Sequence, residues 1–454
     1  PKSRYYTNSR VHCYGYIILR GIAILLVVLG HVNPPFKKII YGFHMALFFI
    51  ISGFLFKDCY DKKLSQWIKA YFQRYIVPYF ILCGVNFLIE ALISICFRAG
   101  MFPFNKYLCG ILYSYGSTEW MPNCSPLWFL TCLFCASCML RSIHLITQSN
   151  SKRIIICLVL SGISYILDVL DVPRLPWNFG TAMMAVLFIE IGFQINKMDI
   201  LNKLKYQGCG VQIFVCIIIL FSATIGIILN PVEIVEFSAN NYGSFILMIM
   251  GSVSASFLLM FFANIVGSST ASAKALTYLG RHTLFLMSFD YFSDFISVRV
   301  LQIFRVHNWL FSFCGKVLVL VIGLQLLQLA IKVIPNESAK KFLSKYLVMD
   351  VDGTLTDGKI YMGAHGEMMK AFNIKDGCGI HDIAIPGGII PVIITGRTSE
   401  IVKKRCGELG IQQVYQGIKN KIEQLNSIAD DLSQVAYIGD DINDLSCMIP
   451  VKEA

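Results

Sequence analysis

The feature that most constrains this chain is a succession of apolar blocks, each about 20 residues long, that continues to about Val333. An α-helix of that length crosses the roughly 30 Å of hydrocarbon in a lipid bilayer. Only 15% of the residues are charged, whereas ordinary soluble domains carry about 25%. The sequence therefore predicts an α-helical domain embedded in the lipid bilayer.

About ten segments are candidate membrane spans by length and apolar content. They are Tyr16–Val32, Ile40–Phe56, Ile76–Phe97, Leu127–Leu140, Ile154–Leu170, Phe179–Ile195, Val211–Leu229, Ser244–Val266, Ala275–Phe295 and Leu310–Ile334. The fourth is short, and the ninth contains Arg281, His282 and Asp290. The predicted fold is a polytopic bundle of about ten transmembrane helices.

Lysine and arginine residues are distributed unequally among the loops of this bundle. With a cytoplasmic N-terminus, the basic clusters in Lys57–Arg74 and Lys197–Lys205 lie inside, and the outside loop Pro231–Tyr242 has no basic residue. This is the pattern of the positive-inside rule. An even number of spans also returns the C-terminus to the cytoplasm. The net charge of +11 is thus explained by membrane orientation, and we expect no nucleic-acid partner.

Cysteines are numerous, but they lie mostly inside the apolar blocks, where a free cysteine behaves as a small hydrophobic residue. Cys132, Cys135 and Cys138 have the spacing of ligands for a metal or an iron–sulfur cluster. They fall in the middle of a span with no evident fourth ligand, so a role in the core is the favoured interpretation.

Two ionisable residues, Arg20 and His31, belong to the first span. Eleven residues at 100° each amount to about 20° more than three turns, which places both side chains on one helix face about 16 Å apart. A fixed cation and a titratable base suit an anionic cofactor and a hydroxyl that must lose its proton. A membrane-interface anchor and a capping histidine explain the spacing equally well.

Further motifs follow in a characteristic order. They are Leu19–Ala23, Val28–His31, Phe43–Met45, Phe48–Phe54, Arg74 with Pro78 and Tyr79, and Leu127–Leu130. This order resembles the acyltransferase-3 family of bacterial membrane proteins, which acylate cell-surface sugars, over residues 14–334. The resemblance implies acyl-CoA as the donor, His31 as the essential general base, and Arg20 and Arg74 as cations that bind the donor.

Two more residues fall at motif positions of this family. His44 is either a binding residue or a histidine satisfied between helices. For Ser52 with Gly53 we favour a packing contact of small residues. The corresponding late helix of the family often ends in histidine, whereas this chain has Phe289 and Asp290 there, so no role is assigned to Tyr278–Asp290.

From Tyr346 the pattern changes to short apolar runs that alternate with helix-like stretches. The runs are Tyr346–Met349, Pro391–Ile394 and Val435–Ile438, and the stretches include Glu400–Leu409 and Lys421–Ala429. Such alternation predicts a Rossmann-like α/β domain whose parallel sheet carries ligand chemistry at the strand C-termini. The predicted domains are 1–335 in the membrane, a linker at 336–345, and 346–454.

Charged and hydroxyl residues follow each predicted strand. Asp350 and Asp352 come after the first and can bind a hard cation while one acts as nucleophile and the other as acid/base. Thr395 and Gly396 follow the second and offer donors for phosphate. Lys421 can neutralise charge in the transition state. After the third strand, the motif Gly439–Asp444 supplies carboxylates for a metal.

This ordered set resembles the haloacid dehalogenase superfamily, and the motifs Asp350–Gly358 and Lys375–Gly377 resemble its capless 3-deoxy-octulosonate 8-phosphate phosphatases. The related domain of some acylneuraminate cytidylyltransferases is equally close. The family continues past Gly439–Asp444 by at least one strand–helix unit, whereas this sequence ends at Ala454. We therefore expect a domain that is incomplete at its C-terminus.

The resemblance also implies roles for individual residues. Asp350 forms an aspartyl-phosphate, and Asp352 is the acid/base and gives its backbone carbonyl to Mg²⁺. Thr395, Gly396 and Lys421 bind the phosphate of a sugar-acid phosphate, and Asp440 binds the metal. Asp441 and Asp444 are supports, while Arg397 and Lys375 either touch substrate or are inert surface charges.

Together these observations predict a bacterial inner-membrane enzyme of surface-polysaccharide synthesis. The bundle transfers an acyl group, acetyl by preference, from acyl-CoA to a glycan acceptor, and a cytoplasmic magnesium-dependent phosphatase acts on a sugar-acid phosphate. The alternative is a transporter or flippase with a non-catalytic C-terminal interaction module. A transporter should have hydropathy symmetry between its halves or paired broken helices, and neither is clear in the sequence.

Overall fold

The computed structural model describes residues 3–56, 64–97, 102–265, 270–305, 308–333, 344–359, 361–363 and 366–451. The chain divides into two compact units, Pro1–Ala330 and Ile331–Ala454. Residues 336–343 of the predicted linker lie outside the described ranges. Each unit is a separate body with its own hydrophobic core.

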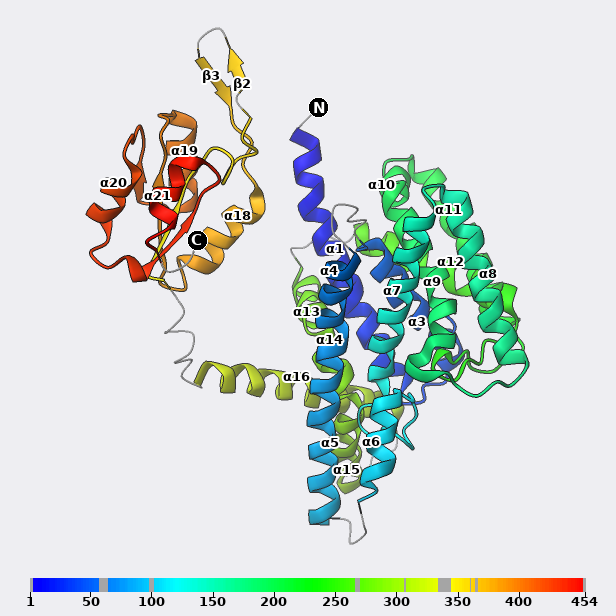
Figure 1. The fold of residues 1–454 in the computed structure, drawn as a ribbon. Coiled ribbons are helices and arrows are strands. Elements are labelled where there is room, and N and C mark those ends of the chain that lie inside the picture. Colours follow the sequence, from blue (N-terminus) through cyan, green and yellow to red (C-terminus); the bar gives the residue numbers. More distant parts are fainter. Residues whose placement is uncertain are drawn as a thin grey trace. The chain divides into compact units, whose positions relative to one another are not determined.

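The first unit is helical (Figure 1). Its helices are α1 Ser3–Gly30, α2 Lys37–Tyr41, α3 His44–Phe54, α4 Leu64–Tyr71, α5 Val77–Phe97, α6 Phe104–Tyr113, α7 Trp128–Ile146, α8 Asn150–Val169, α9 Phe179–Lys197, α10 Ile200–Lys205, α11 Cys209–Ile228, α12 Phe245–Ile265, α13 Ala271–Arg281, α14 Thr283–Ser288, α15 Asp290–Ile303 and α16 Trp309–Val333. A π-helical turn, Phe72–Ile76, joins α4 to α5.

Within the described residues, 7 helical segments are long and apolar enough to cross a membrane. They are Lys37–Phe54, Leu64–Ser94, Ser125–Ile146, Pro176–Lys197, Cys209–Ile228, Phe245–Ile265 and Trp309–Ala330, and Gly15–Gly30 is a shorter apolar helix. The predicted helical membrane domain is thus confirmed as a bundle with several membrane-length helices. Large apolar side chains of α11, such as Phe214 and Phe221, are exposed on the unit's surface, which suits contact with lipid.

The predicted ninth span, Ala275–Phe295, is wrong as a single helix, because it is divided among α13, α14 and α15. The breaks fall at His282 (φ −112°, ψ 21°) and Phe289 (φ −108°, ψ 12°), whose backbones leave the α-helical region. The sequence in this span carries polar residues at both breaks. Irregular backbone at membrane depth is tolerated where it is buried in protein or lines a cavity.

The core of the first unit is built around α9, which packs against α3, α7 and α8, while α1 packs against α12 and α13 (Figure 1). Glycines allow α3 and α9 to approach closely. A Cβ atom on Gly53 would lie 1.8 Å from the carbonyl oxygen of Ile189, and one on Gly192 would lie 2.0 Å from that of Ile50. Gly53 therefore serves the packing contact that its sequence context predicted.

A cluster of buried charged and polar residues joins α7, α8 and α9. The carboxylate of Glu190 accepts hydrogen bonds from His144 Nε2 (2.8 Å), Arg153 Nε (3.2 Å) and Gln194 Nε2 (2.5 Å). All four residues are buried, and burial of an unpaired charge would be costly. Because the charged groups of His144, Arg153 and Glu190 pair with one another across α7, α8 and α9, they fix the register of these three helices.

The second unit contains a four-stranded parallel sheet in the order β5-β4-β1-β6, and a separate antiparallel hairpin, β2-β3. The elements are β1 Tyr346–Met349, β2 Tyr361–Gly363, β3 Gly366–Met369, α18 Ile374–Cys378, β4 Ile390–Ile394, α19 Glu400–Leu409, β5 Gln413–Tyr415, α20 Lys421–Ile428, β6 Val435–Ile438 and α21 Leu445–Met448. Val348 of the central strand β1 pairs with Val392 and Tyr437, and all three are buried. The predicted parallel sheet is confirmed.

Candidate functional site

The first unit contains two substantial cavities. One, of about 220 Å³, is lined by His31 and His44 and is called here the His31 cavity. The other, of about 190 Å³, is lined by Arg20 and Arg74 and is called the Arg20 cavity. The structure therefore groups the four predicted membrane-site residues in pairs and separates the two members of the arginine–histidine motif.

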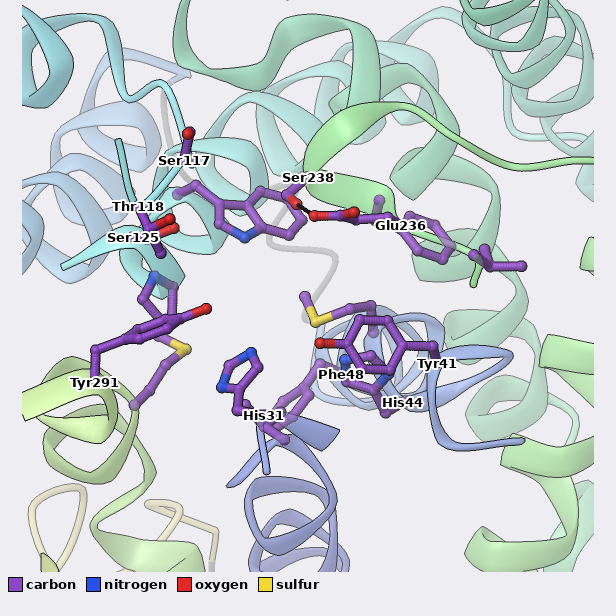
Figure 2. A pocket seen from close by; sticks show the side chains of 18 of the residues that line it. His31, Tyr41, His44, Phe48, Ser117, Thr118, Ser125, Glu236, Ser238 and Tyr291 are labelled. Carbon is purple, nitrogen blue, oxygen red and sulfur yellow. Dashed lines mark hydrogen bonds between the residues drawn. The ribbon is translucent and has the colours of Figure 1, made fainter. Parts of the chain in front are cut away.

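His31 lies in the turn directly after α1 and projects into its cavity between Tyr291 and Tyr41 (Figure 2). Its Nδ1 is 2.5 Å from Oδ2 of Asp290, and its side chain is 16% exposed while that of Asp290 is fully buried. A carboxylate only accepts hydrogen bonds, so Nδ1 carries the hydrogen. Nε2 is then the nitrogen that can accept a proton from a bound molecule.

A lysine holds the other side of the same carboxylate. Lys316 of α16 is fully buried, and its Nζ lies 3.1 Å from Oδ1 of Asp290 and 2.8 Å from Oδ2 of Asp294. Asp290 is also the first residue of α15, where the helix dipole favours negative charge. Lys316 and the N-terminus of α15 therefore both favour the charged form of the carboxylate beside His31.

Sequence reasoning missed both Asp290 and Lys316. Asp290 stands where the family often has histidine, and Lys316 belongs to no motif of the family. The signal that identifies them is their charge inside apolar predicted spans, because an ionisable residue there is a functional candidate by default. Asp290 faces a partner 259 residues away in the sequence, so the pairing itself required the structure.

The Arg20 cavity is cationic. Arg20 donates from Nη2 to Oγ1 of Thr283 at 2.7 Å, and Arg74 lies in the π-helical turn before α5, an irregularity that is frequent at functional sites. Ser52 also lines this cavity, and its hydroxyl donates to the carbonyl oxygen of Phe48 at 2.8 Å. The two guanidinium groups suit an anionic ligand.

His44 lies on the side of the His31 cavity next to Tyr41, with the two rings 4.8 Å apart (Figure 2). Its Nδ1 is 2.9 Å from the carbonyl oxygen of Ile40 in the preceding turn, so Nδ1 is a donor. Across the cavity, Glu236 accepts a hydrogen bond from the hydroxyl of Ser238 at 2.9 Å. The cavity thus presents polar groups on two sides of His31.

In the second unit, acidic residues gather at the C-terminal ends of the two adjacent strands β1 and β6. Carboxylate oxygens of Asp350, Asp440 and Asp444 lie within 4.8 Å of one another. Three hard oxygen donors at that separation fit a cation such as Mg²⁺. Gly353 makes room for them, because its φ is +96° and a Cβ atom there would lie 1.8 Å from Oδ2 of Asp440.

Lys421 connects two of these carboxylates, with Nζ 3.1 Å from Oδ1 of Asp350 and 2.7 Å from Oδ1 of Asp444. Burial raises the pKa of Asp350 above its ordinary value, although Lys421 acts in the opposite direction. Burial opposes the charge on Lys421, but the hydrogen bonds to Asp444 and Asp350 outweigh it and raise the pKa of the lysine. Thr395, directly after β4, is buried beside this group of strand ends.

Asp352 lies apart from the three grouped carboxylates and forms an ion pair with Lys370. Lys370 follows β3 and also contacts Oε1 of Glu367 at 2.9 Å. Sequence reasoning missed Lys370, which stands in a hairpin that shows no catalytic motif. The structure thus adds a cation next to the residue predicted as the acid/base.

Both units of this chain are similar to known proteins. A family model described as an acyltransferase domain, that of the acyltransferase-3 family, matches residues 14–327. The match covers more than half of the sequence, and the chain belongs to the acyltransferase-3 family. Together with the 7 candidate spans, this defines a multi-pass membrane protein with an acyltransferase domain.

The chain is also similar to 3-deoxy-D-manno-octulosonate 8-phosphate phosphatases named KdsC. It is 43% identical to that of Salmonella typhimurium over 118 residues, which are 25% of this chain and 62% of the relative. It is 45% identical to that of Escherichia coli K12 over 108 residues, which are 23% of this chain and 57% of the relative. The chain therefore spans about three-fifths of the length of these relatives.

Solved structures of the same phosphatases are similar to this chain as well. The Moraxella catarrhalis phosphatase, in complex with a magnesium ion, a phosphate ion and a KDO molecule, is 41% identical over 24% of this chain and 63% of its own, with a TM-score of 0.23. The Yersinia pestis phosphatase is 43% identical over 24% and 60%, also with a TM-score of 0.23. The predicted fusion of the two families is confirmed by these sequence matches.

Proposed function

We propose that the first unit transfers an acyl group, acetyl by preference, from acyl-CoA to a hydroxyl group of a surface glycan. The observation that carries this proposal is the His31–Asp290 pair, which faces a polar cavity of about 220 Å³. A base oriented by a buried carboxylate is the arrangement that activates a hydroxyl for attack on an acyl group.

In the proposed reaction, Nε2 of His31 accepts the proton of the acceptor hydroxyl. The hydroxyl oxygen attacks the thioester carbonyl carbon, the new C–O bond forms, and the C–S bond breaks. His31 then returns the proton to the sulfur, which leaves as the thiol of CoA. Asp290 keeps the hydrogen on Nδ1 and stabilises the imidazolium form between the two proton transfers.

The remaining predicted residues supply binding. Arg20 and Arg74 hold the anionic phosphate end of the donor in the Arg20 cavity, where a guanidinium group suits phosphate geometry. His44 lines the cavity proposed for the acceptor and orients the sugar. Glu236 and Ser238 lie on the opposite side of that cavity and offer further hydrogen-bonding partners for sugar hydroxyls.

The orientation of the chain in the membrane belongs to the same proposal. We place it in a bacterial inner membrane, with about ten spans and both termini in the cytoplasm, and the distribution of lysine and arginine supports this topology. Along α1, Arg20 then lies nearer to the cytoplasm than His31. The donor cavity is thus placed on the side from which acyl-CoA arrives.

Replacing Asp290 by asparagine tests the proposed base. Asparagine keeps the shape of the side chain but does not stabilise the imidazolium, so acyl transfer is expected to fall by about 10²–10⁴-fold. The rate is measured as CoA thiol released from acetyl-CoA by the purified full chain with extracted host glycan. Asp171→Asn is the matched control, because Asp171 is exposed and has a left-handed backbone (φ 51°) that asparagine adopts readily. Equal rates for Asp290→Asn and wild type would refute the role of the pair.

For the second unit we propose hydrolysis of a sugar-acid phosphate. Asp350 attacks phosphorus to form an aspartyl-phosphate, and Asp352 donates a proton to the leaving sugar oxygen and then takes one from the water that hydrolyses the intermediate. Thr395, Gly396 and Lys421 hold the phosphate oxygens. Asp350, Asp440 and the backbone carbonyl of Asp352 would hold Mg²⁺, with Asp444 in support, and the ion would offset negative charge on the phosphate.

Removal of the metal tests this second activity. Hydrolysis of 3-deoxy-octulosonate 8-phosphate by the full chain is expected to fall to background in excess EDTA, since the grouped carboxylates would otherwise repel the phosphate. Addition of Mg²⁺ beyond the chelator is expected to restore the rate. Phosphate release is the measurement, and a rate that is unchanged by EDTA would contradict the proposal.

A further inference from the structure

The two cavities of the first unit lie one after the other along the same helices. Along α1, Ile24 lines the Arg20 cavity and Val27 lines the His31 cavity, three residues further on. Along α3 the order is reversed, because His44 lines the His31 cavity and Ser52 lines the Arg20 cavity. Because α1 and α3 meet the two cavities in opposite order along the chain, the cavities lie one after the other along a common axis through the bundle.

Two side chains stand at the junction on this axis. Among the described residues, Phe48 and Met287 line both cavities. Phe48 is one helical turn from His44 and one turn from Ser52, so it lies midway along the lining face of α3. Met287 of α14 stands four residues after Thr283, which lines the Arg20 cavity, and four before Tyr291, which lines the His31 cavity.

The burial of these side chains agrees with a position between two open spaces. Phe48 and Met287 are each half-buried, whereas the neighbouring Phe49 is fully buried in the core. Phe48 is held from one side by Phe129, with ring centroids 5.7 Å apart. Met287 has an unbranched, flexible side chain that can change rotamer at little cost. The junction thus consists of the Phe48 ring, which packs against Phe129, and the flexible side chain of Met287.

The proposed acyl transfer makes this junction part of the reaction path. Arg20 on α1 and His31 in the turn after α1 are about 16 Å apart along the helix axis, and they line different cavities. A donor whose phosphates lie beside Arg20 and Arg74 delivers its thioester to His31 only if its acyl end crosses from one cavity to the other. The described residues that it must pass are Phe48 and Met287.

We infer that Phe48 and Met287 form the passage for the acyl end of the donor and that their bulk restricts the enzyme to short acyl groups. This inference rests on the proposed acyltransferase function. An acetyl group adds little beyond the width of the thioester arm, whereas an octanoyl chain needs space that the ring of Phe48 occupies. A hydrophobic wall of this kind discriminates by about 10–200-fold for each methylene that does not fit.

The test compares acetyl-CoA with octanoyl-CoA as donors for the purified full chain in lipid nanodiscs, with extracted host glycan as acceptor. Wild type is expected to favour acetyl. Phe48→Ala and Met287→Ala are each expected to raise the octanoyl-to-acetyl ratio of kcat/KM by at least about tenfold, and Phe48→Trp to lower it. Phe221→Ala is the control, because Phe221 is exposed on α11 and lines neither cavity; its ratio is expected to match wild type.

The possible results separate this inference from the proposed function. CoA release from acetyl-CoA could depend on His31 while none of the three junction variants alters the octanoyl-to-acetyl ratio of kcat/KM. That result would overturn the passage and leave the acyltransferase proposal standing. If wild type and His31→Ala release CoA equally from both donors, the acyltransferase proposal fails and the passage fails with it. Phe48→Trp retains an aromatic ring in the core, so a folded variant remains if the alanine variants lose stability.

Discussion

Replacing His31 by alanine is expected to reduce acyl transfer by at least about 10²–10⁴-fold, the usual contribution of a general base. The imidazole is the group in the His31 cavity that is paired with a buried carboxylate and has a second nitrogen free to accept a proton. Without it, the acceptor hydroxyl must attack the thioester while it still carries its proton. The measurement is CoA thiol released by the purified chain from acetyl-CoA with extracted host glycan.

The variant is expected to fold, because Asp290 keeps its ion pair with Lys316 at 3.1 Å and no buried charge is left without a partner. His381→Ala is the matched control, since His381 lies in the second unit with a side chain that is 60% exposed. It is expected to retain the wild-type rate. A His31→Ala protein that also retained this rate would exclude His31 as the base.

Replacing Asp350 by asparagine is expected to reduce phosphate release by a factor on the order of 10³ or more, as does the loss of other covalent nucleophiles. The amide has the size of the carboxylate but does not form the aspartyl-phosphate, and it binds a hard cation less well. Acyl transfer is expected to continue at the wild-type rate, because Asp350 belongs to a different compact unit. Both rates are measured on the same preparation of the full chain.

Asp430→Asn is the control for this substitution, because Asp430 is exposed and stands outside the group of Asp350, Asp440 and Asp444. Its phosphatase rate is expected to equal that of wild type. Phosphate release by Asp350→Asn at the wild-type rate would show that another residue is the nucleophile, or that a contaminating phosphatase supplies the activity.

The features that sequence could predict are those with a local or periodic signal. Apolar blocks identify a helical membrane domain because a bilayer requires about 20 apolar residues per span. Asp350, Thr395 and Asp440 each directly follow a strand or its turn, and parallel strands bring their C-terminal ends to one edge of the sheet. The sequence order alone therefore indicated that these side chains belong to one site.

The features that sequence could not predict depend on tertiary contacts. Asp290 is separated from His31 by 259 residues, and only the tertiary contact between the first residue of α15 and the turn after α1 makes it the partner of that histidine. Polar residues mark the breaks at His282 and Phe289, but the apolar content of the segment still predicted one continuous span. Lys370 is likewise brought to Asp352 by the return of a hairpin and has no motif of its own.

Acetate on the surface glycan of an expressing host, measured by mass spectrometry, tests the central claim most directly. The host expresses the full chain as wild type, His31→Ala or Asp350→Asn. We predict acetylated glycan with wild type and with Asp350→Asn, and none above the empty-vector level with His31→Ala. Acetylation by His31→Ala equal to that by wild type would contradict the account, because the base proposed for the transfer would then be dispensable.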